Sequence, residues 1–497
     1  MQIYKEFITA KNGSQIPVFT SGRTMESRYN PERDAENLYN SINEEAGFFL
    51  VLGIGSGIFL KLLSQKYPES KILALELYKD DIDFLLQNES LNQLSKNPSI
   101  SICCLEELET FLTQNYFPAK YGSFKIIEQR SWVNENQTHI ENINLILNKT
   151  FGIISADFSV QAHFGKIWNT NIINNSKLAE KVNSQELYKS IKDNNHKTAV
   201  IAGAGPSLDK TSELLKTNRD TYFIIATDTA GKALIKQNII PDVIVSIDAQ
   251  SVSYNHFINN DISSKILYAF DLCGNSSAAR HLFSQGNNIF FFCSGHPLST
   301  AINAGSGFSL PVFFSGAGTV TITALDIAVQ AGFTDIMILG ADFSYSDGKA
   351  YTSGTYLDTL YNKGSSKLAE TEQTFSKLMF RTELLEITRN KKTTQILQAY
   401  KGSLENYLTE KNISFTKNAD IYKLHCPSHP KLSATPPSAP KALLKPFFDR
   451  LQNAKPEEVE TILLPYVAWL RNNERYKNFT YKELLKLALD TIVSYNI

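Results

Sequence analysis

The sequence has few cysteines, no long apolar run and almost no net charge, and each shortage excludes a class of protein. Its five cysteines form no C-x-x-C pair and no zinc-ligand spacing, which predicts reduced core thiols rather than a disulfide framework. No apolar run approaches membrane-spanning length, and the first residues, MQIYKEFITAKNG, lack the pattern of a signal peptide. A formal net charge of −1 gives no signal for binding a polyanion. We therefore expect a cytoplasmic protein with no membrane or nucleic-acid partner.

What the chain does have is alternation of strand and helix patterns, most clearly between residues 197 and 250. An apolar strand, Ala199 to Ala202, leads into a glycine turn and then into a helical pattern. Two more strand patterns follow, at 222–226 and 243–247, and polar residues stand directly after each. This order predicts an open parallel sheet that binds a ligand at the carboxyl ends of its strands.

The glycine turn has the chemistry of an anion site. Glycines let the backbone approach a ligand closely, so that amide N–H groups and the helix N-terminus face it. The turn lacks the third glycine of a dinucleotide motif and the Lys-Ser/Thr of a P-loop. We interpret it as the site for the phosphate of a donor substrate, formed by Gly203, Ala204, Gly205, Pro206 and Ser207.

Aspartates at the strand ends are candidates for further roles. Asp228, followed by Thr229, is placed either to bind a ribose or base or to cap the following helix. Asp248 is placed to act as a base or to hold a divalent ion. Because no second aspartate stands at D-x-D spacing and no His/Cys cluster is present, we expect no metal site.

The turn, read with two later stretches, resembles that of bacterial sialyltransferases, which have G-N-G-P-S-L where this chain has G-A-G-P-S-L. The likeness resumes at 313–319 and at 336–345, and it covers roughly residues 198–428. A closer resemblance, over most of the chain, is to the motility-associated factor (Maf) family of flagellin nonulosonic-acid transferases. That family shares the G-x-G-P-S-L-D turn and the I-P-D-x-x-x-x-x-D segment seen from Ile240 to Asp248.

These resemblances imply a donor, an acceptor and further site residues. The donor would be a CMP-activated nonulosonic acid, such as pseudaminic or legionaminic acid, and the acceptor a Ser/Thr hydroxyl of flagellin. Ser315 and Gly316 match the sialyltransferase donor site, and Tyr345 and Tyr351 fall near the two tyrosines that hold the departing phosphate.

The chain departs from the sialyltransferase pattern at the catalytic histidine. No histidine occurs from Tyr351 to Leu424, where that family's base is expected. Transfer needs a group that accepts the proton of the acceptor hydroxyl. The sequence leaves this base open among His296, Asp248 and Asp342.

The N-terminal part carries a second glycine turn. The strand at 48–52, the turn at 53–57 and a strand that ends in Glu76 resemble the start of an S-adenosylmethionine-dependent methyltransferase. No other methyltransferase signature follows. The turn and its acid are therefore either a cofactor site or structural features of a nucleotide-fold domain.

The predicted fold class is α/β. We expect Rossmann-like nucleotide-fold domains at 1–130 and 196–430, the second one sialyltransferase-like and catalytic, a helical connector at 131–195, and a helical C-terminal region at 431–497. A long helical segment at 368–411 would form a lid, and 432–440 reads as a proline-rich linker. C-terminal helices are expected at 443–451, 457–470 and 481–494.

The favoured function is a flagellin glycosyltransferase, and three alternatives stay open. One is a methyltransferase that uses the N-terminal turn. A second is a pterin-type pyrophosphokinase, because a pterin diphosphokinase family shares the central domain, although that reaction needs paired carboxylates for magnesium. The third is a non-catalytic flagellin-binding chaperone, which the missing histidine favours.

Overall fold

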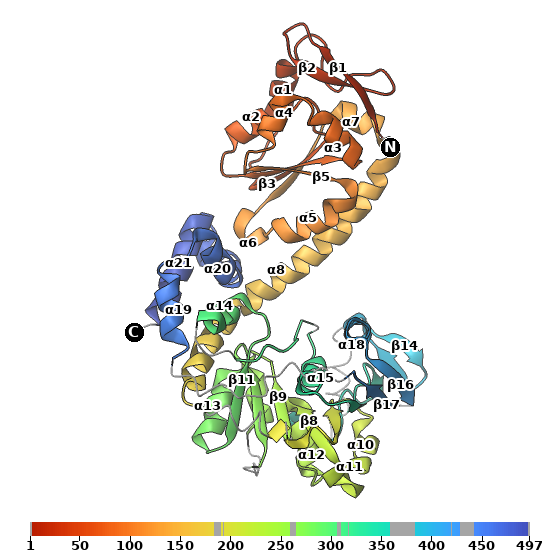
Figure 1. Ribbon diagram of the computed structural model, residues 1–497, viewed down its shortest axis with the longest axis vertical. Helices are drawn as coiled ribbons and strands as arrows, with labels where there is room; N and C mark the ends of the chain where they lie inside the picture. The colour runs from red at the N-terminus through yellow and green to blue at the C-terminus, as the bar shows by residue number, and fades with distance from the viewer. Residues whose placement is uncertain are drawn as a thin grey trace, which may run out of the picture. The chain divides into compact units, whose positions relative to one another are not determined.

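The computed structural model describes residues 2–182, 190–191, 193–258, 265–305, 310–316, 318–357, 383–418, 420–427 and 442–495. The chain divides into two compact units: residues 1–165 with 464–489 form unit 1, and residues 166–463 with 490–497 form unit 2 (Figure 1). The expected linker at 432–440 and the first part of the expected lid, 368–382, lie outside the described residues. The domain boundaries expected at residues 130, 195 and 430 stay a prediction.

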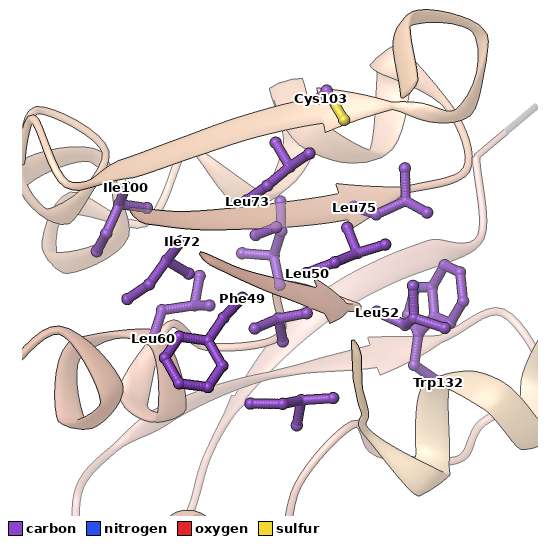
Figure 2. Packing of buried hydrophobic residues seen from close by; sticks show 14 of the residues in the cluster. Phe49, Leu50, Leu52, Leu60, Ile72, Leu73, Leu75, Ile100, Cys103 and Trp132 are labelled. Atoms are coloured by element: carbon purple, nitrogen blue, oxygen red, sulfur yellow. The ribbon is translucent and has the colours of Figure 1, made fainter. Parts of the chain in front are cut away.

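Unit 1 contains a parallel sheet with the strand order β5-β4-β3-β6. Its central strand has the sequence FFLVL and is buried along its whole length, as expected for a parallel strand covered on both faces. Figure 2 shows apolar side chains of β3 and β4 packed together, with Trp132 beside Leu52. The strands are β1 (Tyr4–Thr9), β2 (Gln15–Phe19), β3 (Phe48–Leu52), β4 (Lys71–Glu76), β5 (Ile100–Cys104) and β6 (Phe124–Glu128). The helices are α1 (Pro31–Asn40), α2 (Ile58–Lys66), α3 (Lys79–Leu85), α4 (Glu89–Leu94), α5 (Leu108–Asn115), α6 (Pro118–Tyr121) and α7 (Arg130–Glu135), with the 3-10 turn η1 (Leu105–Glu107).

The expected helical connector is mainly one long helix, α8 (Gln137–Ala179), which belongs to both units. Its apolar stripe faces the core of unit 1, where Ile143 and Leu147 are buried. At Gly165 the helix meets α20 (Pro456–Arg471) so closely that an added Cβ would collide with the carbonyl oxygen of Pro465. Only glycine permits this approach of two helices.

Unit 2 contains an eight-stranded sheet with the order β11-β10-β9-β8-β7-β12-β17-β16. The first six are parallel, and the last two are antiparallel to their neighbours. The strands β8, β9, β10 and β11 are added one after another on one side of β7. The chain then returns and places β12 on the other side of β7. The main strands are β7 (Thr198–Ala202), β8 (Tyr222–Thr227), β9 (Val243–Ser246), β10 (Leu267–Asp271), β11 (Asn288–Phe292), β12 (Asp335–Leu339), β16 (Ser414–Asn418) and β17 (Ile421–His425). The helices are α10 (Leu208–Thr211), α11 (Glu213–Thr217), α12 (Asp228–Lys236), α13 (Ser276–Ser284), α14 (Pro297–Gly305), α15 (Val320–Ala331) and α18 (Gln395–Glu410), with the 3-10 turns η2 (Arg219–Thr221) and η3 (Ser251–His256).

The expectation of continuous helix over 368–411 is wrong for residues 385–393. Residues 385–393 form a hairpin of β14 (Leu385–Thr388) and β15 (Lys391–Thr393), and only α18 is helical. The hairpin is stabilised because β15 also pairs with β13 (Tyr345–Ser346), a strand far away in the sequence. Tertiary pairing therefore overrides the local pattern.

The C-terminal helices and the α/β fold class agree with the sequence. The helices are α19 (Leu444–Leu451), α20 and α21 (Tyr481–Ser494), and their bounds agree closely with the predicted ranges. The 3-10 turn η4 (Glu474–Tyr476) lies between α20 and α21. All five cysteines are buried and free, which confirms the predicted core thiols. In the part of the chain that the structure describes, no helix is both long and apolar enough to cross a membrane.

Candidate functional site

The predicted glycine turn lies at the carboxyl end of β7, where the chain switches sides of the sheet. Gly203 N donates to Leu339 O at 2.8 Å, and Gly205 N donates to Gly340 O at 2.8 Å. An added Cβ on Gly205 would collide with the carbonyl oxygen of Gly340 and with the carboxylate of Asp342. Gly205 is thus required by the protein's own packing, before any ligand is considered.

Asp342 occupies the position at this turn that we assigned to an anion. Its Oδ2 accepts hydrogen bonds from Ser207 N at 3.2 Å and from Ser207 Oγ at 2.9 Å. Burial raises the pKa of Asp342 above its ordinary value. A donor phosphate that used the same N–H group would compete with this carboxylate.

Asp209, two residues further on, holds a distant loop against the turn. Its carboxylate accepts from Thr352 Oγ1 at 2.6 Å and from Ser353 N at 2.8 Å, and it pairs with Lys349 Nζ at 3.1 Å. Thr352 N donates to Ala204 O at 2.9 Å. Burial alone would raise the pKa of Asp209, but the hydrogen bonds lower it below its ordinary value.

These bonds bring two predicted site elements together. Tyr351 is 37% exposed and lies next to Thr352, so it stands beside the glycine turn, although about 150 residues separate the two in the sequence. Tyr345 lies in β13, opposite Lys392 in the small sheet. Sequence reasoning missed Asp209, even though it is the last residue of the shared G-x-G-P-S-L-D pattern.

At the ends of β8 and β9, Asp228 is buried and fully engaged. Its Oδ1 accepts from Thr229 N at 2.7 Å, and its Oδ2 accepts from Ser246 Oγ at 2.7 Å. Asp248 Oδ1 accepts from Gln250 N at 2.9 Å, and burial raises the pKa of Asp248. Asp228 thus has a structural role at the start of α12, and a ligand would have to share its oxygens.

A buried histidine that the sequence did not single out lies in the same place. His256 ends η3, the turn that follows Asp248, and it is 8% exposed. Asp228, Asp248 and Lys232 all act on its charge. No residue spacing in the sequence indicates this grouping.

The predicted base His296 lies away from both of these places, at the ends of β10 and β11. Its Nδ1 accepts from Leu298 N at 3.2 Å, its ring packs against Trp168, and burial lowers its pKa to about 4. Asp271, at the end of β10, is buried, which raises its pKa to about 6. Since neighbouring strands are about 4.8 Å apart, β11 lies roughly 19 Å from β7 across four strand spacings.

Ser315 also lies near the end of β11, because its Oγ donates to Ser294 O at 3.4 Å. Gly316 follows it in the chain. An added Cβ on Gly203 would contact Thr321 of α15, so the segment after Ser315 leads back toward the glycine turn.

The glycine turn of unit 1 is filled by the protein's own side chains. Glu76 accepts from Ile54 N at 2.7 Å, from Trp132 Nε1 at 2.7 Å and from Tyr4 OH at 3.1 Å. Glu26 Oε1 accepts from Ser56 N at 2.6 Å. Burial raises the pKa of Glu76 to about 8 and that of Glu26 to about 7. The oxygens that would bind a ribose are thus already used, which fits the structural interpretation of this turn.

Two cavities lie near these groups. One of about 570 Å³ in unit 1 is lined by residues that include Glu26, Leu38, Phe59 and Arg130. One of about 580 Å³ in unit 2 is an open depression beside Tyr254, Arg280 and His281. Among the described residues, no three His, Cys, Asp or Glu side chains come together as a group that could hold a metal ion.

Comparison with known proteins finds a family model, relatives in one organism and a solved structure that are similar to this chain. A family model described as 6-hydroxymethylpterin diphosphokinase MptE-like matches residues 170–348. A protein of Treponema pallidum (strain Nichols), described as uncharacterized, is 36% identical over 148 residues, which are 30% of this chain and 69% of the relative. A second protein of that organism is 29% identical over 232 residues, 47% of this chain and 77% of the relative. The chain belongs to the same family as the first of these proteins.

A solved structure, the Maf glycosyltransferase from Magnetospirillum magneticum AMB-1, is similar over 100% of this chain and 91% of its own. The identity is 13% and the TM-score is 0.45. The sialyltransferase-like details of the central domain stay a prediction.

Proposed function

We propose that the chain is a glycosyltransferase that moves a nonulosonic acid from its CMP form to Ser/Thr hydroxyls of flagellin in the cytoplasm. The observation that carries the proposal is the loop 349–353, which Asp209 and Ala204 hold against the glycine turn. Open parallel sheets bind ligands at such a switch of strand order. The sequence resemblance to Maf proteins and sialyltransferases supplies the donor and the acceptor.

Tyr351 is the residue whose chemistry the proposal uses first. As the sugar leaves, the CMP phosphate gains negative charge, and a hydroxyl donor beside it stabilises the transition state more than the ground state. Ser315, Gly316 and Tyr345 remain proposed donor contacts, together with the turn residues and Thr229.

The test uses purified protein, flagellin and a CMP-activated nonulosonic acid, with the intact mass of flagellin as readout. We expect mass increments of one sugar each, and Tyr351→Phe should transfer roughly 100- to 1,000-fold more slowly. Tyr222→Phe is the matched control, because Tyr222 begins β8 at the opposite edge of the sheet. Unmodified flagellin with the wild-type protein at every donor concentration would refute the proposal. Binding of flagellin without modification would instead indicate a chaperone.

The family-model match keeps a second candidate, a 6-hydroxymethylpterin diphosphokinase. Phosphoryl-transfer sites of this kind hold magnesium through carboxylates. The described residues contain no group of three or more potential metal ligands, and Asp228 and Asp342 are hydrogen-bonded to serines. Formation of AMP from ATP and 6-hydroxymethylpterin, measured by chromatography, would favour this candidate.

A further inference from the structure

His256 is held rigidly at the carboxyl edge of the unit 2 sheet. It is the last residue of η3, whose start is fixed by Asn275 Nδ2, which donates to Gln250 O at 2.9 Å. Just beyond it, Lys232 Nζ donates to Ile258 O at 3.2 Å. The chain is thus anchored on both sides of the imidazole.

The surroundings of this imidazole suit a group that accepts a proton. Asp228 and Lys232 in α12 and Asp248, just after β9, all act on its charge, and the ring of Tyr356 packs perpendicular to it at 4.6 Å. Burial lowers the pKa of His256 below its ordinary value, the two carboxylates oppose this, and Lys232 adds to it. The ring is therefore neutral near pH 7, and the carboxylates stand ready to stabilise its cation.

One loop connects this histidine to the glycine turn. Thr352 is bonded to Ala204 and Asp209, and Gly354 lies against Ala233 of α12. Four residues after Thr352, Tyr356 packs on His256. The loop 349–357 thus places Tyr351 and His256 along the same edge, Tyr351 beside the end of β7 and His256 after β9, with β8 between these two strands.

We infer that His256 is the general base of the transfer reaction and that Asp248 positions it and stabilises its charged form. The inference rests on the proposed function. The acceptor hydroxyl oxygen forms a bond to the anomeric carbon while the bond from that carbon to the CMP phosphate oxygen breaks. The electron pair of the broken bond stays on the phosphate, which leaves as CMP. The hydroxyl proton passes to the neutral imidazole, which becomes an imidazolium whose charge Asp228 and Asp248 stabilise.

The test compares His256→Asn with His281→Asn. His281 also packs edge-on against a tyrosine, Tyr254, but it lies in α13 and no step of the mechanism uses it. Transfer rate, calorimetric affinity for CMP and melting temperature are measured for both variants. We expect His256→Asn to transfer roughly 100-fold or more slowly, with CMP affinity kept within about threefold. His281→Asn should behave as the wild type.

The pH profile provides a readout that a purely structural role would not change. The wild-type rate should fall on the acid side as the imidazole becomes protonated. Asp248→Asn removes a carboxylate that raises the pKa of His256, so this acid limb should move to lower pH. If His256→Asn does not fold, this shift decides, and an unchanged acid limb in Asp248→Asn overturns the inference.

The outcomes separate this inference from the proposed function. A wild-type protein that modifies flagellin, together with a His256→Asn variant within threefold of its rate, overturns the base assignment alone. A wild-type protein that transfers no sugar at any pH overturns the proposed function and the base assignment with it.

Discussion

At the scale of single residues, both glycine turns are closed by a carboxylate of the protein itself. In unit 1 Glu26 accepts the N–H of Ser56, and in unit 2 Asp342 accepts the N–H of Ser207. The backbone geometry that suits a phosphate also suits a carboxylate, because both are anions that accept from N–H groups. The two turns differ in whether a second acid is bonded to them. In unit 1 Glu76 accepts the N–H of Ile54, whereas among the described residues no second acid is bonded to the Gly203–Ser207 turn.

Asp342→Asn tests whether a phosphate uses the turn of unit 2. The amide oxygen can still accept from Ser207, but the negative charge is gone. Like charges about 4 Å apart repel by about 4 kcal/mol at an effective dielectric constant near 20, so CMP should bind at least tenfold more tightly. Calorimetry measures this affinity. The control is Asp335→Asn, at the amino end of β12, the strand that leads to Asp342. Unchanged affinity would place the phosphate elsewhere.

Glu26→Gln tests the buried acid of unit 1. With a pKa of about 7, folded Glu26 keeps a proton that the unfolded chain releases above its ordinary value of 4.5. Stability from this group is therefore full at low pH and is lost as pH rises toward 7. Melting temperatures from pH 5 to 8 should fall less in Glu26→Gln, by the equivalent of roughly 1 to 3 kcal/mol. The exposed Glu36→Gln is the control, and equal slopes in all three proteins would contradict the burial argument.

At the scale of elements, the loop 349–357 decides which parts of unit 2 can act together. It crosses from the end of β7 to α12 and η3, and hydrogen bonds to Asp209 hold its first part in place. Elements held in this way open at lower cost than core strands. The hairpin β14–β15 adds a second support, since Asp347 N donates to Asn390 O at 3.0 Å.

Asp209→Ala should loosen this loop while the sheet stays intact. The hydroxyl of Thr352, the N–H and hydroxyl of Ser353, and the Lys349 ammonium lose their acceptor, which we expect to cost roughly 1 to 3 kcal/mol. Hydrogen exchange of residues 349–357 should accelerate, and the transfer rate should fall because Tyr351 is no longer held. Glu213→Ala removes an exposed ion pair on the next helix and should change stability by less than about 1 kcal/mol. Unchanged exchange in Asp209→Ala would show that other contacts hold the loop.

At the scale of the whole molecule, two nucleotide-type folds stand in one chain with different capacities for a ligand. Unit 1 has its switch-point turn packed with Met25, Glu26 and Trp132. Unit 2 has polar strand ends, an attached loop and a buried histidine. The N-terminal fold is therefore better explained as a structural domain than as a methyltransferase site.

Hydrogen exchange with and without CMP tests this division of roles. Protection should appear at 203–209 and 349–357 in unit 2, because these segments surround the turn. Residues 53–58 in unit 1 should exchange at unchanged rates, and S-adenosylmethionine should give no protection there. Protection of 53–58 by either compound would restore a cofactor role for the first turn.

The sequence by itself determined most strands of the two parallel sheets, the two glycine turns and the C-terminal helices, because buried parallel strands and tight turns leave local patterns of apolar residues and glycines. The resemblance also assigned Tyr351 and the turn to one donor site, and this assignment stays a prediction. Only the tertiary structure brought Asp342 to Ser207, across 135 residues, and Asp209 to Thr352, across 143. It also grouped His256 with Asp228 and Asp248 and turned 385–393 into a hairpin. These outcomes depend on which strands become neighbours, and hydrogen bonds between distant residues impose no periodicity on the chain that local reading could detect.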